Sequence, residues 1–342
     1  MNFSRRTYEA VFLLAFSSWI AGEVHAAQND DNVEWDGVWS DETFRSPRSP
    51  GTGEDFSLEL RVFRGDLSAA RIRAYDGETR RYEMSWVRNE GIFDIWRGVV
   101  EAGDAGFVYY RFELIDGSDT DYFNRLGMSG NPPGHGDFLV NTTELGAYPL
   151  GATVDGAATV FRVWAPNAQR VAVAGNFNNW SDSSHPLTNV RGFWQGRVPG
   201  ARAGQRYKFA IRNGETIWRT DPRSRRQVSS VGDSIIWSSD YEWGDDGWVT
   251  PYFEDMIIYE LHVGTFTGGG DGVEHHPGRF RDVVDNHLDH LVELGITTVG
   301  LMPIMEFAGE ISWGYNPSFQ FAPEASYGDP DDLKYLVDRC HQ

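Results

Sequence analysis

The chain has 342 residues, of which 40% are hydrophobic and 14% aromatic, which is enough for two or three packed domains. Its formal net charge is −20, from 50 acidic and 30 basic residues. This balance argues against nucleic acid or an anionic membrane as a partner, because phosphate binding needs clustered Lys and Arg side chains. The single cysteine, Cys340, excludes an intrachain disulfide.

Residues 1–26 have the pattern of a secretory signal peptide. Arg5 and Arg6 form a positive start, residues 10–22 are a short apolar stretch, and small residues before and at Ala26 favour cleavage there. The apolar stretch is too short to span a membrane. We therefore expect export to the periplasm or the medium, with no membrane attachment after cleavage. Residues 27–55 are polar and rich in Asp, Ser, Pro and Gly, and are expected to form a flexible leader.

Residues 56–147 contain short runs in which apolar and polar residues alternate. The strands expected from these runs are 56–63, 70–74, 81–87, 95–100 and 108–114. Strands at this spacing, separated by turn residues, are typical of an antiparallel β-sandwich. Together with Tyr82-Glu83-Met84, Trp96 and the run 109–114, they resemble the immunoglobulin-like starch-binding modules that precede neopullulanase-type amylases.

A second β-rich module is expected over residues 153–240. Its most specific motifs are the turn Gly-Asn-Phe-Asn-Asn-Trp at 175–180, the strand Tyr-Lys-Phe at 207–209, and Trp-x-x-Asp-Pro at 218–222. The module resembles the glycogen-binding modules of family CBM48, which occur in glycogen-branching enzymes, isoamylases and the β-subunit of AMP-activated kinase. This second module is therefore also expected to be an immunoglobulin-like β-sandwich.

The resemblance implies a glucan site in which Trp180 and Trp218 stack on sugar rings and Lys208 donates to a hydroxyl group. Flat aromatic rings with a few polar side chains suit the apolar faces and hydroxyl edges of a glucan. Residues 231–234 (Val-Gly-Asp-Ser) stand where binding modules carry a Thr and Asn contact loop. The alternative is a module that keeps the fold and only braces the catalytic domain.

Three other tryptophans of the second module, Trp164, Trp194 and Trp237, are expected to fill its core, because large aromatic side chains are mostly buried.

Residues 253–342 alternate between strand and helix. The expected elements are a strand at 256–264, a helix at 280–294, a strand at 297–304 and a helix from Asp331. This order is that of a parallel (β/α)8 barrel, which needs roughly 250 residues for its eight units. The chain is thus expected to be multidomain, with two immunoglobulin-like β-sandwiches followed by the incomplete N-terminal part of a (β/α)8 TIM barrel.

The barrel segment carries several motifs in a fixed order. They are Tyr259-Glu-Leu-His262, Leu301-Met-Pro303 with Glu306-Phe307, Trp313-Gly-Tyr-Asn316, Phe321-Ala-Pro-Glu324 and Tyr327-Gly328. This segment resembles the α-amylase superfamily (glycoside hydrolase family 13), in the subgroup of branching enzymes, isoamylases and maltooligosyl trehalose trehalohydrolases.

The resemblance implies substrate-binding residues in this segment. Tyr315 would line the sugar site, where the face of its ring could stabilise a positively charged transition state. Asn316 stands where many members have Asp. Trp313 and Glu306 are expected to shape the site rather than to catalyse.

Two patterns in the barrel segment look functional and are interpreted otherwise. Residues 282–287 (Asp-Val-Val-Asp-Asn-His) look like a substrate-binding signature of the family, but they precede the second strand, so we place them on the first helix. His275 and His276, with Asp271 and Glu274, lack the helical spacing of a zinc motif and are expected to be solvated loop residues. No cofactor or protein-bound metal is expected from the motifs, and calcium stays an open alternative that the sequence does not decide.

Retaining glycosidases use a pair of carboxylates, and the resemblance implies that both lie beyond Gln342. The predicted function of the whole protein is retaining cleavage of α-1,4 or α-1,6 glucosidic bonds in starch or glycogen, with an α-glucan as partner and the chain as given inactive. The alternative is a 1,4-α-glucan branching transglycosylase. A third possibility, from another class, is a non-catalytic glucan-binding protein, in which apolar residues such as Ile257, Val299 and Leu301 would need a cover.

Overall fold

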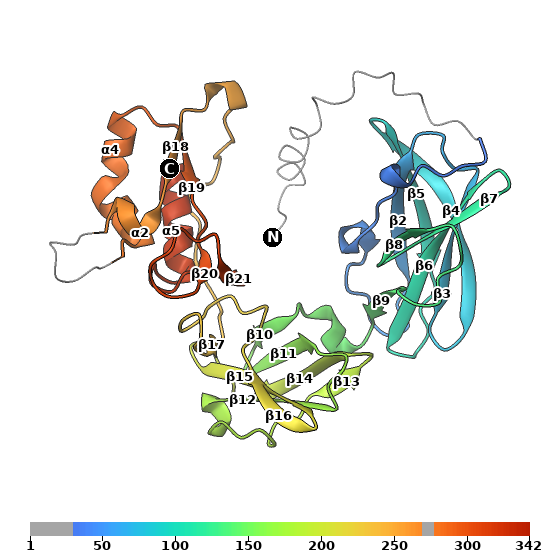
Figure 1. Cartoon of the computed structure of the whole chain (residues 1–342), viewed down its shortest axis with the longest axis horizontal. Helices are drawn as coiled ribbons and strands as arrows, with labels where there is room; N and C mark the ends of the chain where they lie inside the picture. The colour runs from blue at the N-terminus through green and yellow to red at the C-terminus, as the bar shows by residue number, and fades with distance from the viewer. Residues whose placement is uncertain (1–29, 269–276) are drawn as a thin grey trace. The chain divides into compact units, whose positions relative to one another are not determined.

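The computed structural model describes residues 30–268 and 277–342, which form two compact units divided between Ala147 and Tyr148 (Figure 1). The predicted signal peptide and the His275-His276 loop lie outside the described residues. None of the described helices is long and apolar enough to cross a membrane. The described part of the chain is thus multidomain and rich in β-strands, as expected.

The first unit is an antiparallel sheet that folds over on itself. Its described strands are β1 (Arg45–Ser46), β2 (Phe56–Phe63), β3 (Ala69–Tyr75), β4 (Thr79–Glu90), β5 (Phe93–Val100), β6 (Phe107–Asp116), β7 (Asp119–Asn124), β8 (Gly127–Ser129) and β9 (Phe138–Asn141). The order is β1-β2-β5-β4-β3-β6-β7-β8, and β9 pairs with the first residues of β6, on the edge that β7 shares. Strand β4 joins the two halves, because Thr79–Met84 pair with β3 and Ser85–Glu90 pair with β5. Strands β2 to β6 cover the five expected runs.

The core of the first unit comes from the alternation that predicted its strands. Successive side chains of a strand point to opposite faces, so every second residue of β2 is buried. The buried residues of β2, β3 and β6 are Phe56, Leu58, Leu60, Val62, Ala70, Ile72, Ala74, Val108, Tyr110, Phe112 and Leu114. They form one cluster between the two halves of the sheet, which is the packing of a β-sandwich.

The expected flexible leader is wrong for residues 30–55, which pack on the first unit. Val33 and Val38 are only 3% and 7% exposed and belong to its core. Trp39 and Arg61 of β2 exchange two backbone hydrogen bonds of 2.9 Å each, so the leader extends the edge of the sheet. The segment is polar on average, but its few apolar residues, such as Val33 and Val38, pack into the core of the first unit.

Two buried carboxyl groups fasten the start of this segment. Asp116 Oδ2 accepts from the backbone N–H groups of Asp30 and Asn32 at 2.9 and 3.1 Å, and Asp66 Oδ1 accepts from that of Glu34 at 3.1 Å. Both aspartates are fully buried. Burial and the neighbouring Glu34 carboxyl raise the pKa of Asp66 to about 8, so Asp66 is protonated at neutral pH.

The second unit begins with a sandwich of two antiparallel sheets. One sheet has the order β10-β11-β14-β13 and the other β12-β15-β16, with β17 also on β15. The strands are β10 (Gly151–Asp155), β11 (Ala158–Trp164), β12 (Arg170–Gly175), β13 (Thr188–Val190), β14 (Phe193–Pro199), β15 (Arg206–Asn213), β16 (Glu215–Arg219) and β17 (Ser234–Ile235). Phe161, Val173, Trp194 and Phe209 are among the side chains buried between the sheets.

The three tryptophans assigned to this core differ in burial. Trp194 is buried, as predicted, and its indole N–H donates to the Ala165 carbonyl oxygen at 2.9 Å. Trp237 is half-buried. The prediction is wrong for Trp164, which is 47% exposed. Trp164 is the last residue of β11, where its ring lies outside the core at 4.6 Å from the Phe193 ring centroid.

The barrel segment contains one β-α-β unit. Strands β18 (Ile258–Leu261) and β19 (Thr298–Leu301) pair in parallel. The described helical segments between them are α2 (Val263–Phe266), α3 (Phe280–Asp282), η6 (Val283–His287) and α4 (Leu288–Glu293). A hairpin of β20 (Met305–Phe307) and β21 (Pro317–Pro323) follows, and then α5 (Pro330–His341). As predicted, residues 282–287 are helical.

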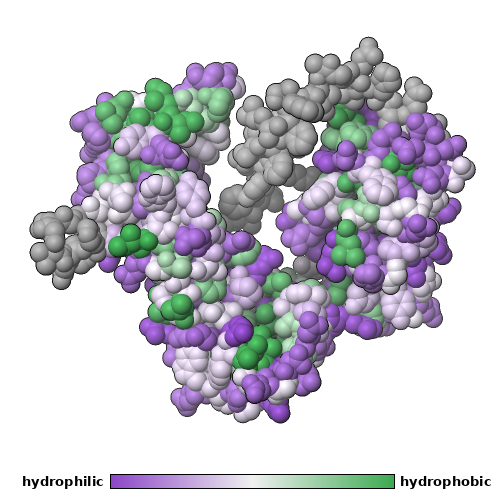
Figure 2. All heavy atoms as spheres, in the orientation of Figure 1, coloured by the Kyte–Doolittle hydropathy of each residue, from purple (hydrophilic) through white to green (hydrophobic). Residues whose placement is uncertain are grey.

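The first strand of this segment is shorter and more exposed than expected. It ends at Leu261 because α2 begins two residues later. Leu261 is buried, whereas Ile257 and Ile258 are more than half exposed. Figure 2 shows hydrophobic side chains gathered near α4 and β18, where Val292 is also exposed. Val299 and Leu301 are only partly buried.

The second module and the barrel segment lie in one compact unit, although they were expected as separate domains at 153–240 and 253–342. The segment that joins them lies along α5. Asp338 Oδ2 accepts from the Tyr241 hydroxyl at 2.9 Å, and Asp338 Oδ1 accepts from the Gly244 N–H at 2.8 Å. The rings of Trp248 and His341 stack with centroids 3.8 Å apart.

Candidate functional site

A tight turn after β12 presents Trp180. The turn begins at Gly175, where a Cβ atom would stand 2.2 Å from the Arg206 carbonyl oxygen, so a side chain does not fit there. Asn179 and Trp180 both have left-handed backbone conformations, with φ of 51° and 59°. Non-glycine residues adopt this conformation only where the surrounding structure holds them.

Asn178 holds this turn. Its Oδ1 atom accepts from the Gly175 N–H at 2.9 Å, and its Nδ2 atom donates to the carbonyl oxygens of Val173 and Ser181 at 3.0 and 3.3 Å. The Trp180 N–H also donates to the Gly175 carbonyl oxygen at 3.0 Å. The indole of Trp180 therefore starts from a fixed backbone.

Strands β15 and β16 supply the other two predicted residues. Tyr207 and Phe209 of β15 are fully buried, so Lys208 between them faces outward. Trp218 lies on β16, opposite Ala210 of β15, and is 40% exposed. Neighbouring strands lie about 4.8 Å apart, so Lys208 and Trp218 stand close on the same side of the sheet.

A buried hydrogen-bond network connects β15 to the loop that carries Asp233 and holds this loop in place. Asp221 Oδ2 accepts from the Tyr207 hydroxyl at 2.5 Å, and the Asp221 N–H donates to Ser234 Oγ at 3.0 Å. Ser234 in turn pairs with Tyr207 across β15 and β17. Burial raises the pKa of Asp221 to about 6, and burial beside Asp221 raises that of Tyr207 well above its ordinary value.

Asp233 precedes Ser234 and reaches the outer face of β15. Its Oδ1 atom lies 3.1 Å from Lys208 Nζ, and both side chains are about one quarter exposed, at 22% and 25%. The sequence marks residues 231–234 only as a departure from the contact loop of binding modules. The structure shows that this loop still reaches the pocket, with a carboxylate at its tip.

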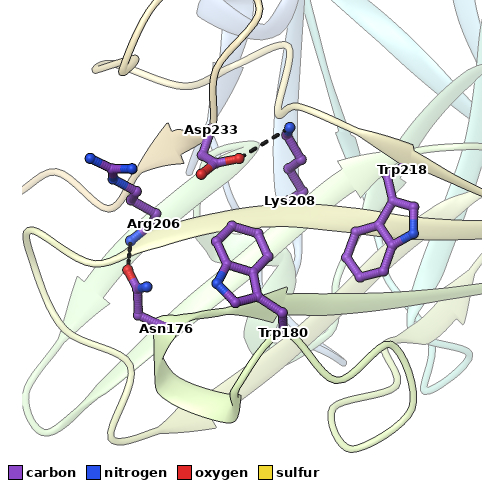
Figure 3. A pocket seen from close by; sticks show the side chains of 6 residues that line it. All are labelled: Asn176, Trp180, Arg206, Lys208, Trp218 and Asp233. Atoms are coloured by element: carbon purple, nitrogen blue, oxygen red, sulfur yellow. Dashed lines mark hydrogen bonds and ion pairs between the residues drawn. The ribbon is translucent and has the colours of Figure 1, made fainter.

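These side chains surround one open pocket of about 490 Å³ (Figure 3). Its lining residues are Asn176, Trp180, Arg206, Lys208, Trp218 and Asp233. The three residues predicted for the module therefore come together, with the two indoles side by side and the Lys208 ammonium turned toward Asp233. Sequence reasoning assigned no role to Asn176, Arg206 or Asp233.

The pocket combines flat aromatic faces with separate donors and acceptors. The Lys208 ammonium can only donate hydrogen bonds, and the Asp233 carboxylate can only accept them. The Asn176 Oδ1 atom is occupied by the Arg206 backbone N–H at 2.7 Å. Aromatic rings that line a pocket beside fixed polar groups suit a ligand with apolar faces and hydroxyl edges.

The three residues predicted for the barrel segment lie on one exposed turn. Trp313 and Tyr315 are 72% and 68% exposed, and Asn316 is also exposed. Between them Gly314 is buried, with φ of 83° and its hypothetical Cβ 2.2 Å from the Pro303 carbonyl oxygen. Only glycine fits there, and this close approach leaves the two rings on the surface.

His262 links the end of β18 to this turn. Its Nε2 atom lies 2.8 Å from the Ser312 carbonyl oxygen and 3.0 Å from the Tyr327 hydroxyl, and its Nδ1 atom lies 2.9 Å from Thr265 Oγ1. Sequence reasoning used His262 only as part of a motif. Ser312 Oγ also donates to Asn316 Oδ1 at 2.5 Å, which fixes the far end of the same turn.

Two buried carboxyl groups stand on the hairpin that carries this turn, Glu306 in β20 and Glu324 directly after β21. Glu306 and Glu324 are each 1% exposed. Glu306 Oε2 accepts from the Ala325 N–H at 2.9 Å, and Glu324 Oε2 accepts from the Phe307 N–H at 3.1 Å. Burial and the neighbouring Glu324 raise the pKa of Glu306 to about 7. Both groups bind backbone amides, as structural carboxyl groups do.

Across residues 30–268 and 277–342, no group of three or more His, Cys, Asp or Glu side chains is arranged to hold a metal ion. The His275-His276 pattern lies outside these ranges.

Comparison with known proteins identifies the module that carries the pocket. Residues 149–224 match carbohydrate-binding module 48, described as the isoamylase N-terminal domain. The chain is 41% identical over 209 residues to the 1,4-alpha-glucan branching enzyme GlgB of Deinococcus radiodurans, covering 58% of this chain and 29% of that one. It is 39% identical over 297 residues to GlgB of Picrophilus torridus, covering 82% and 40%. Its structure matches that of apo pullulanase from Paenibacillus barengoltzii with a TM-score of 0.48 and 26% identity, covering 56% and 35%.

The match thus assigns the module that carries the pocket to family 48 of the carbohydrate-binding modules, and a β/α segment follows this module. The similarity to the branching enzymes extends over more residues than the module itself. The chain belongs to the α-amylase superfamily, glycoside hydrolase family 13, and carries a module of the CBM48 type. It spans between 29% and 40% of the length of the two branching enzymes.

Proposed function

We propose that the pocket of the second module binds α-glucan. The observation that carries this proposal is the placement of two indoles, the half-buried Trp180 and the exposed Trp218, beside the Lys208–Asp233 pair in one pocket. A helical glucan presents successive sugar rings on its surface, and each indole can stack on one of them. The match to family 48 and the glucan named in the relatives' descriptions support this ligand. The alternative, a module that only braces the barrel, does not require both rings to line one open pocket.

Affinity electrophoresis in gels that contain glycogen or amylopectin tests this proposal. The 342-residue chain should be retarded by the polysaccharide, and Trp180→Ala and Trp218→Ala should each weaken binding about tenfold, which corresponds to about 1.4 kcal/mol. Trp164→Ala is the matched control, because Trp164 is exposed on the same module but does not line the pocket. Equal mobility of all four proteins would favour the bracing role.

We further propose that the whole protein acts on α-glucans with retention of configuration. The relatives are named as branching enzymes, which supports transfer with formation of α-1,6 branches. Hydrolysis of α-1,4 or α-1,6 bonds is the second candidate, because the signal-like residues 1–26 favour export and hence degradation. Incubation of the whole protein with amylose distinguishes them: new α-1,6 signals in proton NMR indicate branching, and a rise in reducing ends without them indicates hydrolysis.

We propose that the 342-residue chain binds glucan but does not catalyse its cleavage or transfer. The two glutamates of the β20–β21 hairpin, Glu306 and Glu324, are buried and bound to backbone amides, whereas Tyr315 is exposed. A retarded band in the glycogen gel, with no new reducing ends and no new branches, is the expected result. Measurable turnover by the 342-residue chain would contradict it.

A further inference from the structure

The acidic chain contains a basic stretch, and this stretch supplies most of the pocket. Residues 197–226 hold nine Arg and Lys side chains against two Asp and Glu, although the whole chain has a net charge of −20. Strands β15 and β16, which carry Lys208 and Trp218, lie within this stretch. A local excess of positive charge attracts anionic ligands, even where the rest of a surface repels them. The strands that supply the pocket thus have a charge opposite in sign to that of the whole chain.

Arg206 brings a second cation to the pocket. Side chains two residues apart on a strand lie on the same face, about 7 Å apart, so Arg206 shares the outer face of β15 with Lys208. Lys208 is already paired, because Asp233 Oδ1 lies 3.1 Å from its ammonium group. The Arg206 guanidinium, by contrast, forms no ion pair within the ranges 30–268 and 277–342. Arg206 is exposed and lines the pocket, so its charge is available to a ligand.

The Asn176 side chain adds donors at the same end of the pocket as Arg206 (Figure 3). Its Oδ1 atom accepts from the Arg206 backbone N–H at 2.7 Å, which fixes the orientation of the amide. Its Nδ2 group can therefore only donate, and none of the residues that the structure describes accepts from it. The Arg206 guanidinium and the Asn176 Nδ2 group together form a donor corner, whose free groups donate hydrogen bonds and do not accept them.

We propose that the donor corner binds a phosphate monoester carried by the glucan, on or next to the sugar stacked on Trp180. A phosphate monoester carries a charge of about −1.5 to −2 at neutral pH and three strong acceptor oxygens. Two of these oxygens can pair with the planar guanidinium fork of Arg206. The third can accept from Asn176 Nδ2. The assignment rests on the proposed glucan binding and adds a ligand class to it, namely phosphorylated α-glucan.

The charges that line the pocket favour an anion over a neutral group. Arg206 and Lys208 are opposed only by Asp233, and the Lys208 ammonium already neutralises that carboxylate at 3.1 Å. One positive charge is therefore left, and it stands on Arg206. A neutral sugar hydroxyl in the donor corner would leave this charge to water. An arginine that served only to keep the surface hydrated would give no preference for a phosphorylated ligand.

The test compares two ligands that differ in one group. Maltoheptaose is neutral, and maltoheptaose with one phosphate monoester on a sugar O6 atom differs from it only in the anion. Calorimetry measures the binding of both to the 342-residue chain and to the variants Arg206→Ala, Arg206→Lys and Asn176→Asp. The matched control is Arg202→Ala, which removes the same charge from an exposed position of the basic stretch that does not line the pocket. Melting temperatures confirm that each variant is folded.

The expected result is a preference for the phosphorylated sugar that depends on the donor corner. Wild type and Arg202→Ala should bind it about tenfold more tightly than maltoheptaose, as charge-assisted hydrogen bonds allow. Arg206→Ala should remove this preference by weakening the binding of the phosphorylated sugar alone. Arg206→Lys should keep part of it, because an ammonium keeps the charge but lacks the planar fork.

Asn176→Asp tests the amide separately from the charge of Arg206. The substitution keeps an oxygen to accept from the Arg206 N–H, but it replaces the donor with a second acceptor. It should therefore remove the preference for the phosphorylated sugar and leave the binding of maltoheptaose unchanged. Added salt should lower the wild-type preference, since it screens exposed charges.

The assignment is overturned if wild type binds both sugars equally tightly, or if Arg206→Ala weakens both to the same extent. It is also overturned if Arg202→Ala lowers the preference as much as Arg206→Ala, because the basic stretch would then attract anions without a defined site. In each case wild type still binds maltoheptaose, so the proposed glucan binding stands. If wild type binds neither sugar, the proposed function fails and the assignment fails with it.

Discussion

The Tyr207 hydroxyl donates to the Oδ2 atom of Asp221 at 2.5 Å, in the interior of the second module directly beneath the pocket. Tyr207 lies one residue before Lys208 on β15, and Asp221 lies three residues after Trp218 at the exit of β16. Their hydrogen bond therefore ties β15, which carries Lys208, to the segment that follows β16, which carries Trp218. The Trp-x-x-Asp-Pro motif thus supplies a residue that lines the pocket and a buried hydrogen-bond acceptor.

Tyr207→Phe should lower the free energy of unfolding of the second unit by about 1–3 kcal/mol, the usual cost of leaving a buried polar atom without its partner. The atom that loses its partner is Asp221 Oδ2, and burial already raises the pKa of Asp221 to about 6. Urea denaturation followed by tryptophan fluorescence measures the change. Tyr252→Phe is the control, since Tyr252 is 77% exposed. An equal effect of both substitutions would show that the hydrogen bond is unimportant.

The stability of the first unit should fall as the pH rises toward 8. Asp66 keeps its proton up to a pKa of about 8 in the folded chain, and its ordinary value is 3.8. The folded state thus binds more protons between these values, and its extra stability is fully present below 3.8 and lost as the pH rises through 8. Glu34 and Asp116 are the carboxyl groups that face Asp66.

Asp66→Asn should flatten this pH dependence, because the amide stays neutral throughout the range. Denaturation midpoints at pH 5, 6.5 and 8 measure the slope for each protein. Asp104→Asn is the control for an exposed carboxylate. A wild-type midpoint that rises between pH 5 and 8, with no difference in slope for Asp66→Asn, would contradict the assignment.

Val33→Asp and Val38→Asp should each destabilise the first unit, because both valines belong to its core. Burial of a valine side chain is worth about 1.5–3 kcal/mol, and a buried carboxylate adds a further cost. Val99→Asp is the control, since Val99 is 52% exposed. Thermal unfolding of the chain measures all three. If the two core variants melt with the control, residues 30–55 do not dock as described.

Gly314→Ala should disturb the Trp313–Asn316 turn more than Gly309→Ala. The two glycines have nearly the same φ, 83° and 84°, so both substitutions strain the backbone. Only at Gly314 does the new Cβ also collide with the Pro303 carbonyl oxygen, while nothing lies within 4 Å of the Cβ at Gly309. A larger fall in melting temperature for Gly314→Ala is the expected outcome, and equal falls would show that the collision is relieved without cost.

The part of the fold that could be predicted consists of strands in which apolar and polar residues alternate along the chain. Strands β2 to β6 follow runs such as 56–63, in which every second residue is apolar. Trp180, Lys208 and Trp218 could be assigned together because three short motifs resemble those of CBM48 modules. In the structure these motifs fall on the turn after β12 and on β15 and β16, and β15 pairs with both β12 and β16.

The missed features depend on contacts between distant residues. Asp233 reaches Lys208 because Ser234 pairs with Tyr207, and nothing near residue 233 in the sequence indicates that pairing. Val33 and Val38 are isolated in a polar stretch, and their burial depends on strands that follow much later. Trp164 was assigned to the core by residue type, but its place at the end of β11 decides its exposure.

The Asp338 carboxyl group accepts hydrogen bonds from both Tyr241 and Gly244, so unfolding of α5 also releases the segment that joins the second module to the barrel segment. Asp338 lies in the last turns of α5, and Trp248 stacks on His341 of the same helix. The joining segment is therefore ordered by a helix that follows it by about ninety residues in the chain. A protease that cuts between Ser239 and Trp248 should therefore report on α5: we expect cleavage to be slow while the helix is intact and fast once its last turns unwind.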